Sequence, residues 1–310
     1  MKALLVNTEL NLIRDIGTKS TLFKIKNYLE DYGWCVEYFV ATTYDIYKKK
    51  MMEFHPDITL CYDYKSMDGI DLRKVNTELK IPDIFVSSDL LEIFLNKQST
   101  KDVALEFNFK TPESMIVRRN TDHIDIPFSP PYFVKPLHGG DSRGIYHDNV
   151  FTNKEELIKY INSTSLIDDD YLIEEFINND HSSEIAFFLS YYPNHIYYST
   201  LRYHYSLPVN QTYKYLSKTI KDYPSMYSAY PEIIDYPYSE EIIDKLIQIF
   251  NKWNTYGIIK SEFIERDSAL LLIEVNGIPG LNHCFKHTSI ANKISENEYI
   301  NKIFMDALQK

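Results

Sequence analysis

Glu274 is the one acidic residue of an otherwise apolar segment, ALLLIEVN at residues 269–276. A carboxylate buried there without a partner would be costly, so Glu274 needs a nearby cation. Glu274 and Asn276 share one face of a strand, and Glu262 lies in the preceding apolar segment, GIIKSEF. If the two segments pair as a hairpin, two carboxylates and an amide oxygen converge, which suits Mg²⁺ bridged to phosphates. The simpler alternative is a glutamate at a strand end paired with Lys260.

A lysine followed by a glycine-rich stretch is the second chemical signal. In YFVKPLHGGDSRGI, residues 132–145, Lys135 ends a short apolar run and Gly139, Gly140 and Gly144 follow. One interpretation is a hairpin turn at the glycine pair, beside a solvated lysine. The other is a phosphate clamp, because glycines let backbone N–H groups approach an anion and the lysine adds a positive charge. The rest of the chain must decide between them.

The first 88 residues have the pattern of a small parallel α/β domain, in which strands alternate with helical stretches. A helix is expected from Gly17 to Asp31. Strands are expected at residues 2–7, 34–40, 57–62 and 83–88. The turn after the first strand, Asn7 to Leu10, is not glycine-rich, which argues against a dinucleotide-binding Rossmann start.

The remaining residues predict a mixture of short helices and strands. Helices are expected at 90–97, 101–107 and 153–162, and around the apolar stripe of Ile242, Leu246, Ile249 or Phe250, and Trp253. Strands are expected at 114–117, 132–134, 171–177, 184–190, 195–205, 257–263 and 270–276. Residues 206–238 are rich in Pro, Tyr and Ser without a clear period, so they are interpreted as a long, functional loop.

Composition narrows the class of protein. A chain of 310 residues with 25% charged residues is an ordinary globular composition, and it suggests roughly two or three domains. The net charge of −11 disfavours general nucleic-acid binding. No run of apolar residues is long enough for a transmembrane helix, so no membrane partner is expected. Three widely separated cysteines suggest neither a disulfide framework nor a zinc site, which fits a cytoplasmic location.

Five stretches, in order, resemble the ATP-grasp superfamily and, within it, the D-alanine–D-alanine ligase branch. They are NKQSTK at 96–101 with TP at 111–112, FVKPLHGGDSRGI, YLIEEFI with SSEIAFFL, TYKYLS at 212–217, and GIIKSEF with LIEVNGIPGL. The resemblance covers residues 90 to about 285. It implies an α/β (α+β ATP-grasp) protein: a parallel α/β domain at 1–88, a central ATP-grasp subdomain at 89–170 that carries the glycine loop, and a C-terminal subdomain at 171–310 that carries the metal site.

The resemblance also implies a set of residues that bind ATP. Lys97, Lys135 and Lys214 would contact the phosphates under the glycine loop. Glu174 would bind the adenine amino group, and Glu184 the ribose hydroxyls. An exposed glutamate on a strand is the alternative for both acids. The full implied set is Lys97, Lys135, Gly139, Gly140, Asp141, Ser142, Gly144, Glu174, Glu175, Phe176, Ile177, Glu184 and Lys214.

The implied metal ligands are Glu262, Glu274 and Asn276, which would hold two Mg²⁺ ions, with Mn²⁺ as an alternative. Catalytic roles fall to Lys260, Lys214 and Arg143. A substrate carboxylate would attack the γ-phosphate of ATP to give an acyl phosphate and ADP, and an amine would then displace phosphate to form an amide. Lysines and metal ions suit this chemistry, because phosphoryl transfer depends mostly on positioning and charge neutralisation.

The implied substrates are a small-molecule carboxylate and an amine, amino acids or small peptides. Asp141 stands where the D-alanine ligases carry a serine, and Phe285 and Lys286 stand where they carry a serine and a leucine that bind the product carboxylate. We therefore expect a pocket that does not simply join two D-alanines. Two alternatives stay open: a ligase that loads an amino acid onto a carrier protein or peptide, and a nucleotide-binding protein without ligase activity. A homodimer is suggested by the family alone.

Overall fold

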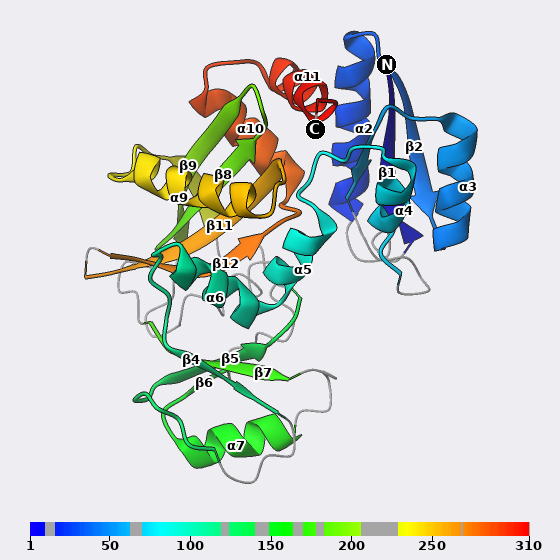
Figure 1. The fold of residues 1–310 in the computed structure, drawn as a ribbon. Coiled ribbons are helices and arrows are strands. Elements are labelled where there is room, and N and C mark those ends of the chain that lie inside the picture. Colours follow the sequence, from blue (N-terminus) through cyan, green and yellow to red (C-terminus); the bar gives the residue numbers. More distant parts are fainter. Residues whose placement is uncertain are drawn as a thin grey trace.

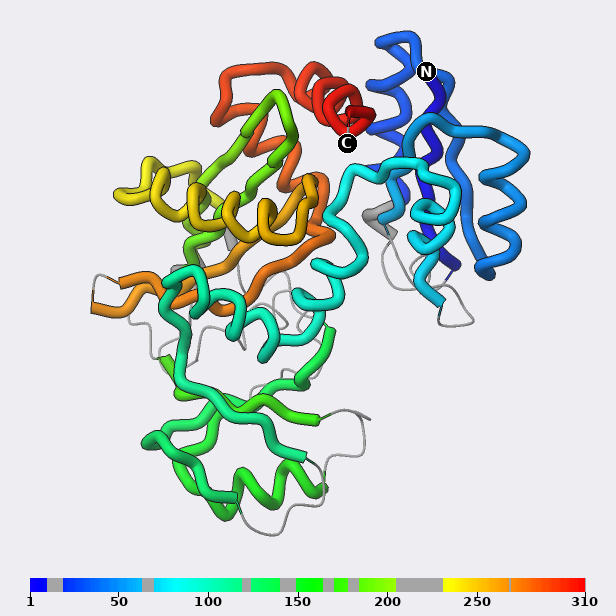
Figure 2. The backbone as a smooth tube through the Cα atoms, viewed as in Figure 1, coloured from blue at the N-terminus to red at the C-terminus, as the bar shows by residue number. Residues whose placement is uncertain are grey.

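The computed structural model describes residues 1–9, 16–62, 70–118, 124–139, 149–163, 170–177, 183–205, 229–267 and 269–309. Three sheets organise these residues (Figure 1). The first sheet comes from the start of the chain, the second from its middle and the third from its second half. The backbone trace shows the middle sheet as a separate lobe at one end of the molecule (Figure 2).

The first sheet is parallel, as the sequence predicts, with strand order β2-β1-β3. Its strands are β1 (Lys2–Thr8), β2 (Cys35–Ala41) and β3 (Ile58–Cys61), and its helices are α2 (Ile16–Asp31), α3 (Tyr44–Phe54) and α4 (Arg73–Leu79). All of β1 after Lys2 is buried, because helices cover the sheet and the strand is central.

The expected strand at 83–88 is wrong. Asp83 forms a single bridge with Thr59, and the chain then leaves the sheet. The Asp83 carboxylate accepts hydrogen bonds from the backbone N–H groups of Cys61 and Phe85, which fixes a bend in place of a ladder. Ser87 then caps helix α5 (Ser88–Leu95) by accepting from the Leu90 N–H.

The second sheet is antiparallel, with strand order β4-β7-β5-β6. Its strands are β4 (Ser114–Val117), β5 (Tyr132–Pro136), β6 (Val150–Phe151) and β7 (Tyr171–Glu175). Helix α7 (Lys154–Ser163) covers one face with Leu157 and Ile161. Asn153 caps the start of this helix by accepting hydrogen bonds from the N–H groups of Glu155 and Glu156.

The third sheet is also antiparallel, with strand order β10-β9-β8-β11-β12. Its strands are β8 (Ser183–Tyr191), β9 (Ile196–Tyr205), β10 (Ala229–Ile233), β11 (Gly257–Arg266) and β12 (Ala269–Asn276). Strand β10 corrects part of the predicted loop, because residues 229–233 pair with the long strand β9. Residues 206–228 of that loop lie outside the described residues.

Helices cover both faces of the third sheet. Helices α5, α6 (Lys97–Glu106) and α9 (Ser239–Lys252) pack on one face. Helices α10 (Leu281–Ala291) and α11 (Glu296–Ala307) lie on the other side, against α2 of the first sheet.

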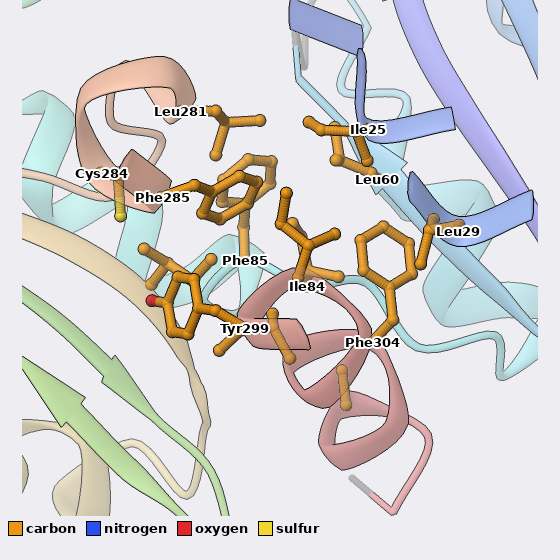
Figure 3. Close-up of a cluster of buried hydrophobic side chains, with 14 of the residues drawn as sticks. Ile25, Leu29, Leu60, Ile84, Phe85, Leu281, Cys284, Phe285, Tyr299 and Phe304 are labelled. Atoms are coloured by element: carbon orange, nitrogen blue, oxygen red, sulfur yellow. The ribbon is translucent and has the colours of Figure 1, made fainter. Parts of the chain in front are cut away.

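The start and the end of the chain share one hydrophobic core (Figure 3). Side chains of α2 and β3 meet those of α10 and α11, with Ile84 and Phe85 of the connecting segment between them. Trp34 donates a hydrogen bond to Asn301 and packs edge-on against Phe304. The domain boundaries at residues 88 and 170 stay a prediction. Within the described residues, no helix has both the length and the apolar character needed to span a membrane.

Candidate active site

A pocket that opens to solvent, called the cavity below, is bordered by strands β5 and β7 of the second sheet and by strands β11 and β12 of the third. Its lining is mostly apolar and includes two glutamates: Pro112, Phe133, Glu174, Glu175, Phe176, Ile177, Ile264 and Ile273. Ile177, Ile264 and Ile273 also belong to one small hydrophobic cluster. Such a slot suits a flat ring with polar groups on its rim.

The backbone after β7 forms one edge of this cavity. The N–H of Glu175 donates to the Glu113 carbonyl and the N–H of Phe176 to the Pro131 carbonyl, each at 2.9 Å. Among the described residues, the N–H of Ile177 meets no backbone acceptor. The Glu175 side chain forms an ion pair with Arg266 at 2.8 Å, which links the two sheets beside the cavity.

Two buried lysines share the carboxylate of Glu174. The Lys135 Nζ lies 2.7 Å from one Glu174 oxygen, and the Lys101 Nζ lies 2.9 Å from the other. The three side chains are between 1% and 3% exposed. Glu174 is thus no exposed strand residue, and Lys135 is no solvated strand end. The alternatives of an exposed glutamate and a solvated lysine are therefore both wrong. Charges buried this deeply need oppositely charged partners, and here they pair with one another.

Sequence reasoning missed Lys101. The segment NKQSTK carries two lysines four positions apart, and only Lys97 was assigned a role. On a helix these positions lie on one side, and both side chains are buried. The burial of Lys101 pushes its pKa below the ordinary value of 10.5, although Glu174 opposes that shift.

Lys97 fastens the start of α6 to the base of the glycine-rich stretch. Its Nζ donates to the Gly139 carbonyl at 2.7 Å, and its N–H donates to the Leu137 carbonyl at 3.0 Å. Gly139 has φ +87°, in the left-handed region that favours glycine. Other predicted residues lie outside the described part of the chain: Gly140, Asp141, Ser142, Arg143, Gly144 and Lys214.

The predicted hairpin of β11 and β12 is confirmed. Glu262 stands directly opposite Glu274, and Lys260 stands opposite Asn276. Like charges at opposed positions destabilise a sheet unless a cation lies between them. The Asn276 Oδ1 accepts a hydrogen bond from the Ile278 N–H at 3.0 Å, which orients the amide. The metal-binding role of these side chains stays a prediction.

Lys260 lies close to Glu262 of this hairpin and to Glu184 of the neighbouring strand β8. It forms an ion pair with Glu262, and its Nζ is 3.9 Å from Glu184 and 5.1 Å from the centre of the Tyr203 ring. Burial lowers the pKa of Lys260, but Glu262 and Glu184 raise it by more, so the net pKa is raised. Burial, then the charge of Glu262, raises the pKa of Glu184 well above its ordinary value. Glu184 is only 9% exposed, so the alternative of an exposed strand residue is wrong for it too.

The predicted metal site has the right donors but is not a complete cage. No group of three or more His, Cys, Asp or Glu side chains within the described ranges could hold a metal ion by itself. Glu262, Glu274 and Asn276 offer hard oxygen atoms from two paired strands, Glu262 from the middle of β11 and the other two from the end of β12. A divalent cation would relieve the repulsion between the opposed carboxylates, with phosphate oxygens or water as its other ligands. The residues therefore fit Mg²⁺ held jointly with a nucleotide.

Helix α10 carries Phe285 and Lys286, two of the positions at which the sequence differs from the D-alanine ligases. Phe285 is 1% exposed and packs against Tyr299 in the shared core (Figure 3). It cannot bind a substrate carboxylate. Lys286 is exposed on the same helix, together with His283. A cationic group is therefore available there.

Comparison with known proteins agrees with this geometry. A family model described as D-ala D-ala ligase C-terminus matches residues 106–300. A D-alanine–D-alanine ligase from Fusobacterium nucleatum is 25% identical over 189 residues, which is 61% of this chain. The matched region spans only 58% of the length of that relative.

Solved structures share the fold over nearly the whole chain. The crystal structure of D-alanine–D-alanine ligase from Bacillus anthracis complexed with ATP has a TM-score of 0.72 at 16% identity, covering 100% of this chain and 98% of that one. An L-amino acid ligase from Bacillus licheniformis has a TM-score of 0.67 at 14% identity, covering 99% and 74%. These likenesses confirm the predicted fold class. Because the family model matches more than half of its residues, the chain belongs to the D-alanine–D-alanine ligase C-terminal family, within the ATP-grasp superfamily.

Proposed function

We propose that the protein is an ATP-dependent ligase that joins a carboxylate to an amine and releases ADP. One observation carries this proposal. The cavity has a β5–β7 wall and a β11–β12 wall, and on each wall a charged residue lies two positions along the strand from an apolar residue that lines the cavity. On β5 these are Phe133 and Lys135, and on β11 they are Ile264 and Glu262. Residues two apart share a strand face, so each wall passes from apolar to charged. An adenine ring suits the apolar part, and phosphates suit the charged part.

The residue roles in this proposal are those that the resemblance to the D-alanine–D-alanine ligase family implies. The backbone at 175–177 and the Glu174 carboxylate would bind the adenine edge, and Glu184 would bind the ribose. Lys97, Lys135 and Lys214 would neutralise the phosphates. Glu262, Glu274 and Asn276 would hold Mg²⁺, which supplies charge neutralisation for the transferred phosphoryl group. Lys260, which forms an ion pair with Glu262, would supply the positive charge that steadies a tetrahedral intermediate.

The proposed reaction has two steps. A substrate carboxylate oxygen attacks the γ-phosphorus of ATP, the bond to the β-phosphate oxygen breaks, and ADP leaves. An amine then attacks the acyl carbon, phosphate departs with the bonding electrons, and the amine loses a proton. Because the acyl phosphate would hydrolyse in water, the site must exclude solvent between the steps.

We further propose that the substrates are amino acids or small peptides other than two D-alanines. The buried Phe285 removes the side chain that the D-alanine ligases use to bind the product carboxylate. Exposed Lys286 offers a cation at longer reach, which suits a larger or differently charged acceptor. The L-amino acid ligase supports this, since it has a similar fold and a different named substrate class.

A matrix of amino-acid pairs tests the proposal. Each pair is incubated with ATP and Mg²⁺, and both phosphate release and product mass are measured. We expect at least one pair to give a dipeptide with ADP, and D-alanine alone to react more slowly than that pair. Efficient formation of the D-alanyl dipeptide would refute the substrate claim. Nucleotide binding without turnover on any pair, or on any carrier peptide, would favour a binding protein.

A further inference from the structure

Lys101 has no role in the proposed function, yet it is one of the most buried charges near the cavity. It is 2% exposed, and its Nζ contacts a Glu174 oxygen at 2.9 Å and the Pro112 carbonyl at 2.8 Å. Both Glu174 and Pro112 line the cavity. Burying the ammonium group of a lysine costs desolvation free energy. Because a buried ion pair seldom adds to the stability of the fold, a specific function accounts better for this lysine.

The geometry indicates different roles for Lys101 and Lys135. Glu174 presents one oxygen to Lys101 and the other to Lys135. Lys135 extends from the strand that also carries the cavity residue Phe133, whereas Lys101 extends from α6 and is tied to Pro112 as well. Without Lys101, the ammonium of Lys135 would have to neutralise the charge of the Glu174 carboxylate by itself. An ammonium held in that way binds a phosphate less well, because the carboxylate competes for it.

We propose that Lys101 is a positioning residue for the nucleotide phosphates: by binding one oxygen of Glu174, it leaves Lys135 available to them. This inference rests on the proposed function, since it concerns the same site. It differs from a purely structural role in a measurable way. A residue that only shaped the cavity wall through Pro112 would affect every ligand of the cavity equally, with or without phosphates.

The test is a series of ligands that differ in phosphate number. Binding of ATP, ADP and adenosine to the wild type and to Lys101→Met is measured by calorimetry in the presence of Mg²⁺. We expect Lys101→Met to weaken ATP binding about 10- to 100-fold, the range of a charge-assisted hydrogen bond. Adenosine binding should change by no more than about twofold. Lys101→Arg should restore most of the ATP affinity, because it keeps the charge.

A double-mutant cycle isolates the contact with Glu174. In a Glu174→Gln background, Lys101→Met should change ATP affinity by only about twofold, because the neutral amide no longer draws on Lys135. If Lys101→Met does not fold, the pair Glu174→Gln and Glu174→Gln/Lys101→Met still provides the comparison. Lys159→Met, which removes an exposed lysine of α7, is the matched control and should bind like the wild type.

The outcomes separate this inference from the proposed function. If the wild type binds ATP and Lys101→Met binds it equally well, the inference is overturned and the function stands. The same holds if Lys101→Met weakens ATP and adenosine by the same factor, or if its effect persists unchanged in the Glu174→Gln background. If the wild type binds no nucleotide, the proposed function fails and the inference fails with it.

Discussion

The two walls of the cavity balance charge in opposite ways. On the β5–β7 wall, Glu174 is sandwiched between Lys101 and Lys135, and all three are almost fully removed from solvent. On the β11–β12 wall, Glu262 stands opposite Glu274 and forms an ion pair with Lys260, whose side chain is 19% exposed. The first wall has ion pairs that are buried in the protein interior. The second has like charges opposed across a hairpin.

This difference indicates how each wall meets a ligand. Fixed, buried pairs cost little reorganisation when an anion arrives, so the lysine wall is organised before binding. Opposed carboxylates gain most when a divalent cation arrives, so in the proposed function the acidic wall would be completed by the metal ion that accompanies the nucleotide. A nucleotide with its metal ion would supply the negative charge to the first wall and the positive charge to the second.

The largest expected effect comes from the acidic wall. Glu274→Gln removes the charge of a predicted metal ligand with little change in shape, so turnover should fall on the order of 10²-fold or more. ADP production measures this, and circular dichroism should show an unchanged fold. Glu240→Gln on the exposed start of α9 is the control and should leave turnover intact. Near-normal ADP production by Glu274→Gln would remove the metal role.

A smaller effect is expected from the lysine wall. Lys135→Met should weaken ATP binding by about 10- to 100-fold, because it removes a charged hydrogen-bond donor to the phosphates. Calorimetric titration with ATP and Mg²⁺ measures the loss. Adenosine affinity serves as the internal control and should change little. Equal losses for ATP and adenosine would mean that Lys135 only supports the fold.

The smallest effect is a contrast in the pH dependence of stability. The raised pKa of Glu184 means that the folded chain keeps a proton that the unfolded chain releases above pH 4.5. Its contribution to the free energy of unfolding is therefore complete below pH 4.5 and is lost as the pH rises through the folded-state pKa. The lowered pKa of Lys101 has the opposite consequence, because the unfolded chain binds the extra proton. Its contribution grows as the pH rises toward 10.5.

Denaturant titrations without divalent metal, from mildly acidic to alkaline pH, measure both slopes. Glu184→Gln should remove the falling contribution, and Lys101→Met the rising one. Each slope is limited to about 1.4 kcal/mol per pH unit for one proton. The free energy of unfolding of each variant is subtracted from that of the wild type at each pH. A difference that does not change with pH would mean that the substituted side chain does not titrate as described.

Much of this architecture could be predicted from local patterns. The alternation of strands and helices predicted the parallel first sheet, and the apolar runs around Glu262 and Glu274 predicted their hairpin. The failures came from contacts distant in sequence. Residues 83–88 have strand-like composition, but the Asp83 carboxylate bonds the backbone of Cys61 and turns the chain away. Strand β10 forms because β9 offers it a partner, not because residues 229–233 have a strong pattern of their own.

The site shows the same limit. The chemistry of Lys135 and Glu274 could be inferred from an apolar segment that ends on or contains a charge. Lys101 could not, because its importance depends on Glu174, which is 73 residues away and meets it only in the folded protein. Burial of Phe285 likewise depends on Tyr299 of the next helix. Contacts of this kind leave no local signal.

The most direct test of the central claim is to trap the activated carboxylate between the two walls. The protein is incubated with Mg²⁺, ATP and pooled amino acids, with hydroxylamine as the only added amine acceptor beyond them, and products are identified by mass. We expect amino-acid hydroxamates in an amount equal to the hydroxylamine-dependent increase in ADP, and none with Glu274→Gln. AMP and pyrophosphate in place of ADP, or hydroxamates formed without ATP cleavage, would contradict the central claim.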